Sequence, residues 1–436
     1  MPRSAPLIAC LLGLLLVAAP AHAVSRPPWG TGESHGEDLV ISLVTFSPGD
    51  DVASWWGHGS LVVEDQRLGS ARLYNYGMFS FDSTMLARYA MGRLEFWVAE
   101  ASPSGTYRLY RAMDRDVRIQ ELNLTPDQRL EIGRLLADNV LPENRDYLYQ
   151  HYSDNCVTRL RDMIDKAVGG QLKQADSAPA RMTLRDHTRR YTAVSPPMSV
   201  LLDFLMNDEI DRPITRWDEA FLPDELERQV ASLQVTRPDG QKVPLVAKHW
   251  DFYKSNRTPP PEEPPRYGPW MLLMGLALGA SALGLGYWGR RGGRLPRVLL
   301  GLEQVVLGLG LGFPGTALLI MWLFTDHTVT YRNENLFLAN PLTLLVFPLG
   351  IAFIFGSKRA RAWLRVIWLG LAGLGVLGLV LKLLPVFNQD NWRLIALILP
   401  ISLGFAGAFN LERLLARLSA GSRAPGQQPL PSSLKT

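Results

Sequence analysis

Five long apolar segments in the C-terminal half of the chain constrain its fold more than any other feature. They lie at about 269–288, 298–325, 339–356, 366–387 and 392–410. Each approaches or exceeds the roughly 20 apolar residues that a helix needs to cross a bilayer. The second segment is long and contains Glu303 and Pro314, so we expect it to tilt or kink. The sequence therefore predicts an all-α bundle of about five transmembrane helices over residues 268–411.

Basic residues between these segments predict the orientation of the bundle. Arginines and lysines follow the first and third segments, at positions 290, 291, 294, 297, 358, 359, 361 and 365. The loops at 326–334 and 388–391 carry little positive charge. Because basic loops remain in the cytoplasm, the chain before the first span should lie outside it and residues 412–436 should form a cytoplasmic tail.

The N-terminus has the pattern of a secretory signal. Arg3 precedes an apolar stretch at 7–19, and Ala21-His22-Ala23 has the small-x-small pattern of a cleavage site. A lipoprotein signal ending at Cys10 is disfavoured, because too little apolar chain precedes this cysteine. We therefore expect a signal peptide over residues 1–23 and an exported domain after it.

Residues 24–255 have the pattern of an α+β domain. Apolar runs predict strands at 39–46, 61–63, 73–76, 93–99, 107–111 and 117–122, and helices starting at 126, 156 and 199. The stretch 171–255 has mixed helix and strand signals, and the sequence assigns it no role. Residues 256–267 form a proline-rich linker of polyproline type, so we expect a stiff spacer before the spans.

Charge and cysteine content narrow the function classes. With 45 basic and 41 acidic residues, the net charge is +4, or roughly +3 after loss of Arg3, and no basic stripe suggests a nucleic-acid partner. The only cysteines are Cys10 and Cys156. Removal of the signal would leave one thiol without a disulfide partner in an oxidising compartment.

Cys156 follows Asp154 and Asn155, which are good N-cap residues, and precedes an apolar helical pattern. A thiol in the first turn of a helix should have a lowered pKa, and the free N–H groups there can stabilise an oxyanion. This placement suits a cysteine nucleophile. A small buried core residue is the alternative, and the sequence leaves the two about equally favoured.

A cysteine nucleophile needs a base, and His58 is the best candidate among seven histidines. It lies between two glycines at the start of an apolar strand, and Asn75 on the next strand could orient its ring. His151 is a rival base, although a residue five positions before a helix-start cysteine has no favoured geometry toward it. His58 could also be an ordinary core or turn residue.

Three motifs give the chain a recognisable resemblance. Residues 57–61 read Gly-His-Gly-Ser-Leu, residues 74–77 read Tyr-Asn-Tyr-Gly, and residues 154–159 read Asp-Asn-Cys-Val-Thr-Arg. Together they resemble the N-terminal periplasmic domain of the Lnb family. The likeness continues at His327, at 333–336 (Asn-Glu-Asn-Leu) and at 340–342 (Asn-Pro-Leu). The resemblance implies a circularly permuted papain-like (NlpC-like) α+β fold, in which the histidine strand precedes the cysteine helix.

The same resemblance implies lipoprotein N-acylation at a bacterial inner membrane, with the N-terminal domain in the periplasm. An acyl chain would pass from a phospholipid to Cys156 as a thioester, and then to the α-amine of a lipoprotein. His58 would be the base, and either Asn75 or a neighbouring tyrosine would orient it. His327, Asn333 and Asn335 would lie at the membrane interface and bind head groups, or would only cap helices. No cofactor is implied.

Two other functions remain open from the sequence. A membrane-tethered cell-wall amidase or peptidase could use the same dyad, although one anchor would suffice for it. A non-catalytic membrane chaperone for secreted proteins would need only a buried Cys156. No metal site is predicted, because the histidines and acidic residues lack ligand spacing and one thiol cannot build a zinc site.

Overall fold

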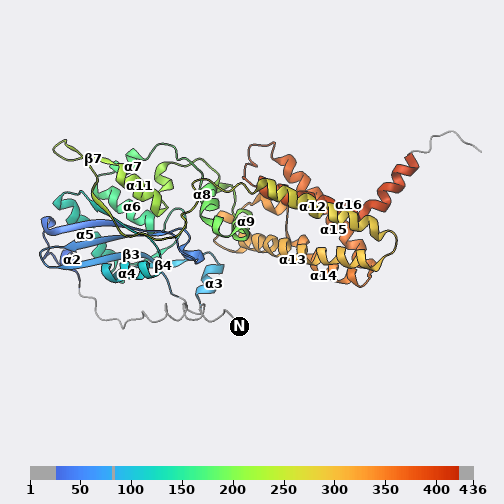
Figure 1. The fold of residues 1–436 in the computed structure, drawn as a ribbon, viewed down its shortest axis with the longest axis horizontal. Coiled ribbons are helices and arrows are strands. Elements are labelled where there is room, and N and C mark those ends of the chain that lie inside the picture. Colours follow the sequence, from blue (N-terminus) through green and yellow to red (C-terminus); the bar gives the residue numbers. More distant parts are fainter. Residues whose placement is uncertain (1–25, 81–83, 422–436) are drawn as a thin grey trace, which may run out of the picture.

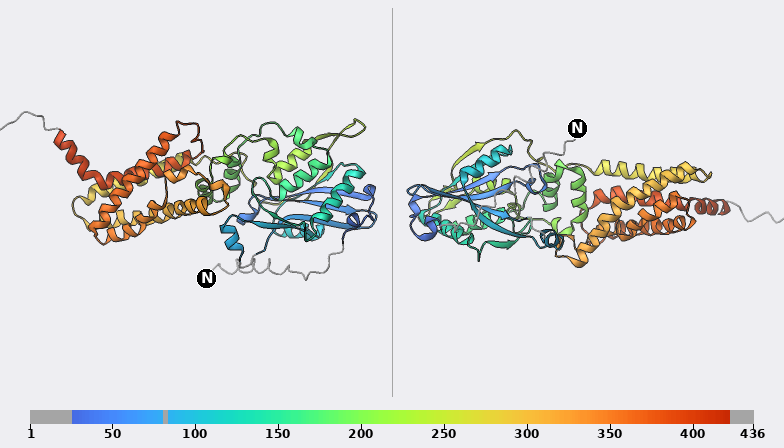
Figure 2. Two further views of the ribbon diagram at one scale, coloured as in Figure 1. Left: turned by 180° about the vertical axis from the view of Figure 1, so that it is seen from behind. Right: turned by 90° about the horizontal axis from the view of Figure 1, so that it is seen from below.

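The computed structural model describes residues 26–80 and 84–421, with side chains up to Asn410. It has an N-terminal α/β region built on a sheet and a helical C-terminal part, and the two meet end to end (Figures 1 and 2). The predicted signal peptide at 1–23 lies outside the described residues, and the whole predicted tail at 412–436 lies beyond the last residue with a described side chain.

The centre of the N-terminal region is a seven-stranded antiparallel sheet with the order β6-β4-β3-β2-β1-β5-β9. Its strands are β1 (Leu39–Phe46), β2 (His58–Asp65), β3 (Ser70–Met78), β4 (Glu95–Ala101), β5 (Val117–Leu122), β6 (Asp146–Leu148) and β9 (Val246–Tyr253). The predicted strands at 39–46, 61–63, 73–76, 93–99 and 117–122 are confirmed. The apolar side chains alternate along β1 and β2, so each strand contributes to the core on both faces of the sheet.

Helices cover both faces of the sheet. One core contains Leu61, Tyr74 and Leu160 and unites the sheet with α5 (Pro126–Asn139) and α6 (Cys156–Ala167). A smaller core on the other face contains Val44 and Phe46, against which Tyr107 and Tyr110 of α4 (Pro103–Ala112) pack. A short helix, α2 (Pro28–Thr31), adds the fully buried Trp29 to the first core.

The predicted strand at 107–111 is wrong, because this stretch belongs to α4. The Ser102 hydroxyl accepts a hydrogen bond from the Gly105 N–H, and Pro103 occupies the first helical position. A serine cap followed by proline is a strong helix start. The start signal determines the structure here, although the apolar spacing of 107–111 also fits a strand.

The stretch 171–255 connects the sheet to the bundle and also completes the sheet. It contains α7 (Gln171–Ala175), α8 (Leu184–Tyr191), α9 (Pro196–Leu205), α10 (Arg216–Glu219), α11 (Pro223–Ser232) and a hairpin of β7 (Gln234–Thr236) with β8 (Lys242–Pro244), followed by β9. Figure 1 shows α8 and α9 between the sheet and the long helices. The predicted helix starting at 199 is α9, which begins earlier, at Pro196.

The bundle contains four helices that are long and apolar enough to cross a membrane. These are α12 (Gly268–Gly289), α13 (Arg294–Phe324), α15 (Lys358–Leu381) and α16 (Trp392–Gly421), whose apolar part is Trp392–Asn410. The predicted span at 339–356 is α14 (Pro341–Ile354), which has 14 residues and is bent by 55° from the preceding helical stretch Thr328–Phe337. Asn340 caps α14 and Pro341 follows it, so the helix cannot extend further back.

Glycines allow the spans to approach closely. A Cβ on Gly279 of α12 would lie 2.4 Å from the Pro400 carbonyl oxygen of α16. A Cβ on Gly312 of α13 would lie 2.4 Å from the Leu344 backbone of α14. Inside a membrane the hydrophobic effect does not drive helices together, because lipid tails are as apolar as the side chains. Small residues at such contacts let the helix backbones pack closely, which favours their association.

A buried network of charged side chains joins the N-terminal region to the bundle. Arg189 of α8 donates to Asp203 of α9 at 2.9 Å and to Asp390, in the loop before α16, at 2.5 Å. Arg185 bonds both Asp203 and Asp211, and the Asp390 N–H donates to Asp211 at 2.8 Å. Because these partners come from both parts of the chain, they fix the sheet domain against the outer end of the bundle.

The proline-rich linker is held against the domain. Arg190 of α8 donates to the Pro261 carbonyl at 2.7 Å, and Arg181 donates to the Glu262 carbonyl at 3.2 Å. The predicted spacer is therefore a docked segment rather than a freestanding one.

Candidate active site

Cys156 is the first residue of α6, as the sequence predicts. The Asn155 side chain accepts hydrogen bonds from the N–H groups of Val157 and Thr158, and the Thr158 hydroxyl accepts from the Asn155 N–H. The side-chain nitrogen Nδ2 of Asn155 also donates to the carbonyls of His151 and Phe221, at 2.8 and 2.9 Å. This buried asparagine therefore fixes both the start of the helix and the loop before it, and so the position of the thiol.

The thiol is partly exposed, and backbone N–H groups of Gly59, Cys156 and Val157 point at its sulfur. Burial nevertheless dominates and raises the pKa of Cys156 to about 11, while the three N–H groups act in the opposite direction. The expectation of a lowered thiol pKa is therefore wrong for this structure. At neutral pH the group is a thiol that needs a base to become a nucleophile.

His58 is the first residue of β2, and its ring is held by Asn75 of the neighbouring β3. The Nε2–H of His58 donates to Asn75 Oδ1 at 2.5 Å. Within the described part of the chain no group bonds to Nδ1, so a neutral ring with this tautomer has its free lone pair there. Burial lowers the pKa of His58 to about 4, so the ring is neutral and can accept a proton.

The thiol and the imidazole meet at the same end of β2. The Gly59 N–H that reaches the sulfur belongs to the peptide that follows His58. On β3, a Cβ built on Gly77 would lie 3.6 Å from Cys156 Cβ, two residues beyond Asn75. The structure thus gathers Cys156, His58 and Asn75 where α6 and β2 begin and β3 ends.

The tyrosines beside Asn75 do not serve as ring partners. The Tyr74 hydroxyl accepts from Trp29 Nε1 at 2.9 Å, and the Tyr76 hydroxyl accepts from Asn139 Nδ2 at 2.7 Å. Both tyrosines are buried in the first core. Asn75 is therefore the residue that orients the His58 ring in this structure.

Two further residues near His58, Tyr110 and Arg115, were not predicted from the sequence. Tyr110 of α4 lies parallel to the His58 ring at a centroid distance of 6.4 Å and stacks on Phe46 at 3.8 Å. The guanidinium of Arg115 lies 4.6 Å from the Tyr110 ring and adds to the forces that keep His58 unprotonated. The sequence analysis did not predict this contact because it assigned 107–111 to a strand. The contact depends on α4, which packs Tyr110 against the sheet.

His151, the rival base, lies in an aromatic setting. Its ring packs edge-on against Trp56 at 4.3 Å and Tyr152 at 4.7 Å, and its Nδ1 is 3.4 Å from the Tyr149 hydroxyl. Burial lowers the pKa of His151 to about 4. No side chain of the described residues bonds to its Nε2, and its Nδ1 has only the long contact to the Tyr149 hydroxyl, whereas His58 has a close amide acceptor.

The three predicted head-group ligands have partners within the protein. His327 Nε2 donates to the Tyr89 carbonyl at 3.0 Å. Asn333 and Asn335 are buried, and both donate to the Phe204 carbonyl at the end of α9. Both thus bond the end of α9, and Asn333 also caps the 3-10 helix Glu334–Phe337, which precedes α14. Binding of head groups by these residues stays a prediction.

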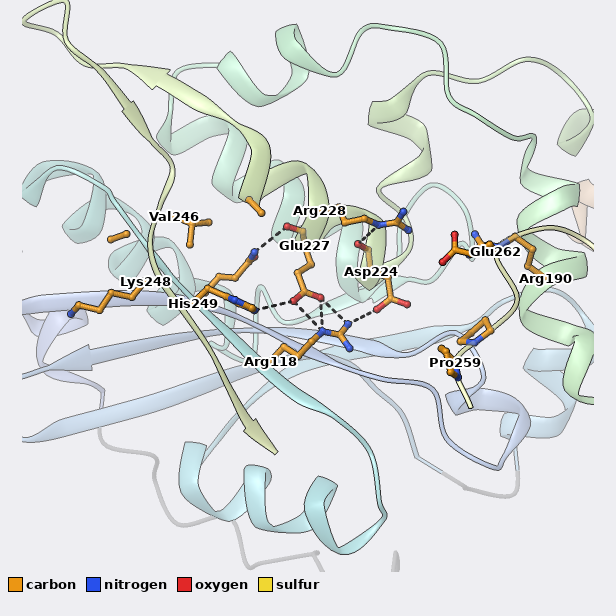
Figure 3. A pocket seen from close by; sticks show the side chains of 14 residues that line it. Arg118, Arg190, Asp224, Glu227, Arg228, Val246, Lys248, His249, Pro259 and Glu262 are labelled. Atoms are coloured by element: carbon orange, nitrogen blue, oxygen red, sulfur yellow. Dashed lines mark hydrogen bonds and ion pairs between the residues drawn. The ribbon is translucent and has the colours of Figure 1, made fainter. Parts of the chain in front are cut away.

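A charged cavity of about 720 Å³ lies elsewhere on the domain, between β5, α11, β9 and the linker (Figure 3). Arg118 projects into it and pairs with Glu227 at 2.8 Å and with Asp224 at 2.5 Å. None of the three candidate site residues lines it. Arg118, Asp224 and Glu227 pair with one another there, and the linker residues Pro259, Pro260 and Glu262 form part of its wall.

One cluster within the described ranges has the composition of a metal site. His187, Glu219 and Glu225 place ligand atoms within 4.8 Å of one another. However, His187 Nε2 donates to Glu219 at 2.7 Å and Arg190 donates to His187 Nδ1 at 3.0 Å, while Arg181 lies 3.4 Å from Glu225. Both ring nitrogens and both carboxylates already have partners, so these residues do not fit a resident cation. The absence of a metal stays a prediction.

These features define a class: an α/β domain with a cysteine, histidine and asparagine at one sheet end, fixed to a bundle of candidate membrane helices. Residues 25–190 match the family model described as the Lnb N-terminal periplasmic domain. The match contains all three site residues and confirms the resemblance, so this chain carries an Lnb-type N-terminal domain. Searches of curated proteins and of solved structures found no match. The domain and the apolar helices together fit a membrane protein with a periplasmic N-terminal region.

Proposed function

We propose that the protein is a thiol-dependent acyltransferase of the bacterial inner membrane that N-acylates lipoproteins. The observation that carries the proposal is the gathering of Cys156, His58 and Asn75 in a domain that is joined to a bundle of candidate membrane helices. A helix-borne cysteine beside a strand-borne, asparagine-held histidine is the arrangement of papain-like enzymes, and a permuted papain-like fold would present it in this chain order. The Lnb-type domain match supports the same reading.

The first half-reaction would use the neutral pair that the pKa shifts favour. His58 Nδ1 takes the proton of Cys156 as the sulfur attacks an ester carbonyl of a phospholipid. A C–S bond forms and the C–O bond to glycerol breaks. The glycerol oxygen takes the proton from His58 and leaves as a lysophospholipid. The Asn155 side chain bonds the N–H groups of Val157 and Thr158 but not that of Cys156, so the Cys156 N–H is a donor for the oxyanion.

The second half-reaction would transfer the acyl chain to nitrogen. The α-amine of a diacylglyceryl-modified lipoprotein attacks the thioester carbonyl and loses a proton to His58. The C–N bond forms, the C–S bond breaks, and the released sulfur recovers its proton. Both substrates would be anchored in the leaflet that faces the domain, and the domain that carries the thiol is bonded to that end of the bundle. The four candidate spans already exceed the single anchor that a cell-wall amidase would need.

Mass spectrometry of lipoprotein N-termini tests this function in cells that depend on the protein for N-acylation. Wild-type protein should give N-acylated termini, whereas Cys156→Ala and His58→Ala should leave the amine free. A general base typically contributes about 10²–10⁴-fold to a rate, so His58→Ala should lose nearly all activity.

His151→Gln is the matched control, because it removes the other nearby imidazole, and it should retain N-acylation. Unchanged termini with Cys156→Ala would exclude the catalytic role and favour a chaperone. A change in cell-wall peptides with unchanged termini would favour an amidase.

A further inference from the structure

The short helix α3 (Met85–Ala90) presents apolar side chains that the domain leaves uncovered. Leu86 is 78% exposed, Tyr89 is 54% exposed and Met91, at the end of the helix, is 44% exposed. Three large apolar side chains on about two turns are unusual for a surface that faces water, and such a patch marks a binding surface.

This helix is bonded to the outer end of the second span. The Asp326 N–H donates to the Met91 carbonyl at 2.8 Å, and Arg93 donates to the Asp326 carboxylate at 2.8 Å. The His327 ring bonds the Tyr89 carbonyl, as described above. Gly92 has φ of +79°, and a Cβ there would lie 2.7 Å from the Asp326 carbonyl carbon, so the backbones touch. The position of α3 is therefore set by the bundle.

The exposed side chains of α3 continue a lipid-facing surface. Leu323 and Phe324, the last residues of α13, are 57% and 67% exposed, and Asp326 follows them directly. With 31 residues, α13 is about 46 Å long, which exceeds the roughly 30 Å hydrocarbon core. Its outer end thus reaches the head-group region, where tyrosine and arginine side chains such as Tyr89 and Arg93 are favoured.

Aromatic side chains connect the neighbourhood of α3 with the thiol. Phe79, just beyond β3, packs against Phe96 of β4 at a centroid distance of 5.2 Å, and Phe96 stacks on Tyr149 at 4.5 Å. Tyr149 and Cys156 both pack against the first core. Burial raises the pKa of Tyr149, and the nearby Cys156 adds to this effect. All three rings are partly exposed. We call Phe79, Phe96 and Tyr149 the aromatic row.

We propose that α3 inserts into the outer leaflet and that the aromatic row guides an acyl chain from this leaflet to Cys156. The second half of the proposal rests on the proposed function, whereas the insertion of α3 does not. An uncharged, partly open row of rings suits an acyl chain, because it offers apolar contact without a competing charge. The bonds of Asp326 and His327 to α3 and its end would hold this helix, where the acyl chain would enter, at a constant position relative to the bilayer.

Nitroxide labels on single cysteines test the insertion in the full chain reconstituted in phosphatidylethanolamine and phosphatidylglycerol vesicles. In a Cys156→Ser background, Leu86→Cys places a label on α3 and Leu109→Cys places one on α4. Leu109 is a matched control, since it is 58% exposed on a helix farther from the bundle (Figure 1). The label at 86 should collide more with oxygen and less with a water-soluble nickel chelate than the label at 109. Equal access of the chelate to both labels would overturn the insertion.

Acylation of Cys156 tests the aromatic row. Leu86→Asp and Phe96→Ser should each slow thioester formation from membrane phospholipid by about tenfold, the effect of losing one large apolar contact. Acylation by a water-soluble short-chain nitrophenyl ester should remain unchanged, as should both rates for Leu109→Asp. An equal loss with both donors would overturn the guiding role. If wild-type protein formed no thioester with either donor, the proposed function would fail, while the label result would still decide the insertion.

Discussion

The Cys156 thiol and the His58 imidazole are both uncharged near neutral pH, because burial opposes the charged form of each group. The thiol stays protonated below a pKa of about 11, and the imidazole stays neutral above a pKa of about 4. A preformed thiolate–imidazolium pair is therefore not the resting state. The base must remove the proton as the substrate arrives.

The first prediction concerns the pH dependence of thiol reactivity. Alkylation of Cys156 by iodoacetamide should accelerate about tenfold per pH unit from pH 6 to 9, because the thiolate fraction rises at this rate below the pKa. Peptide mass spectrometry of the full chain measures it, with Cys156→Ser as the blank. A rate that is already constant between pH 5 and 8 would reveal an ion pair and contradict the assigned charge states.

The second prediction concerns the partner of the His58 ring. Asn75→Ala removes the acceptor of Nε2–H and should lower the acylation rate by about three- to tenfold, the value of one hydrogen bond. Tyr76→Phe removes a neighbouring hydroxyl that bonds Asn139 instead, and it should leave the rate unchanged. Thioester formation on Cys156 is the readout. The reverse order of effects would assign the orienting role to the tyrosine.

Residue types and their places at a helix start and a strand start predicted Cys156 and His58 as a pair, with a third group on the next strand. They could not choose between Asn75 and its neighbouring tyrosines, since that depends on which face of β3 each side chain occupies. Tyr110 and Arg115 could not be predicted, because their contact with the histidine site requires α4 to cross the sheet. The thiol pKa was mispredicted because burial at a helix start cannot be judged from the capping pattern.

At the scale of elements, strong local signals were sufficient. The start of α6 follows from its asparagine cap, and its end from Gly169 and Gly170, both of which have positive φ. The β1–β2–β3 order follows from apolar runs with a polar turn between them. Where two local signals compete, as at α4, or where a cap and a proline cut a hydrophobic run, as at Asn340, hydrophobic periodicity alone gave the wrong element or length.

The third prediction tests the packing of the spans. Gly279→Leu should disrupt the bundle, because its side chain would collide with the α16 backbone at Pro400. Gly284→Leu is a matched control on the same helix, since nothing lies within 4 Å of its added Cβ. Size-exclusion chromatography in detergent should show aggregated or lost protein only for Gly279→Leu. A monodisperse Gly279→Leu variant with normal yield would contradict the close contact of α12 and α16.

At the scale of the whole molecule, the orientation of the domain on the bundle depends on charged groups far apart in the sequence. Arg189, Asp203 and Asp390 lie up to 201 residues apart and come together only after both parts have folded. The sequence could not assign a role to the stretch 171–255 for this reason. Its helices α8 and α9 join the domain to the bundle, and no local sequence pattern predicts such a long-range contact.

The fourth prediction addresses this contact. Arg189→Met removes one of the two arginines that bond the buried Asp203, while Arg185 remains, and should cost about 1.5–3 kcal/mol, the value of a hydrogen bond between charged groups. Arg26→Met, which breaks the exposed pair with Asp138, should cost less than about 1 kcal/mol. Limited proteolysis of the full chain in detergent should cut the 256–267 linker faster in Arg189→Met only. Equal cleavage rates would show that the network does not hold the domain.

The central claim is that Cys156 carries an acyl chain between two membrane substrates. Intact-mass measurement of the purified full chain, incubated with phospholipid vesicles and no acceptor, tests it most directly. The account predicts a mass gain of one acyl chain on Cys156, reversed by neutral hydroxylamine and absent in Cys156→Ala. Addition of a diacylglyceryl lipopeptide with a free α-amine should discharge the adduct and produce the N-acylated peptide. No adduct on wild-type protein, together with an unmodified lipopeptide, would contradict the account.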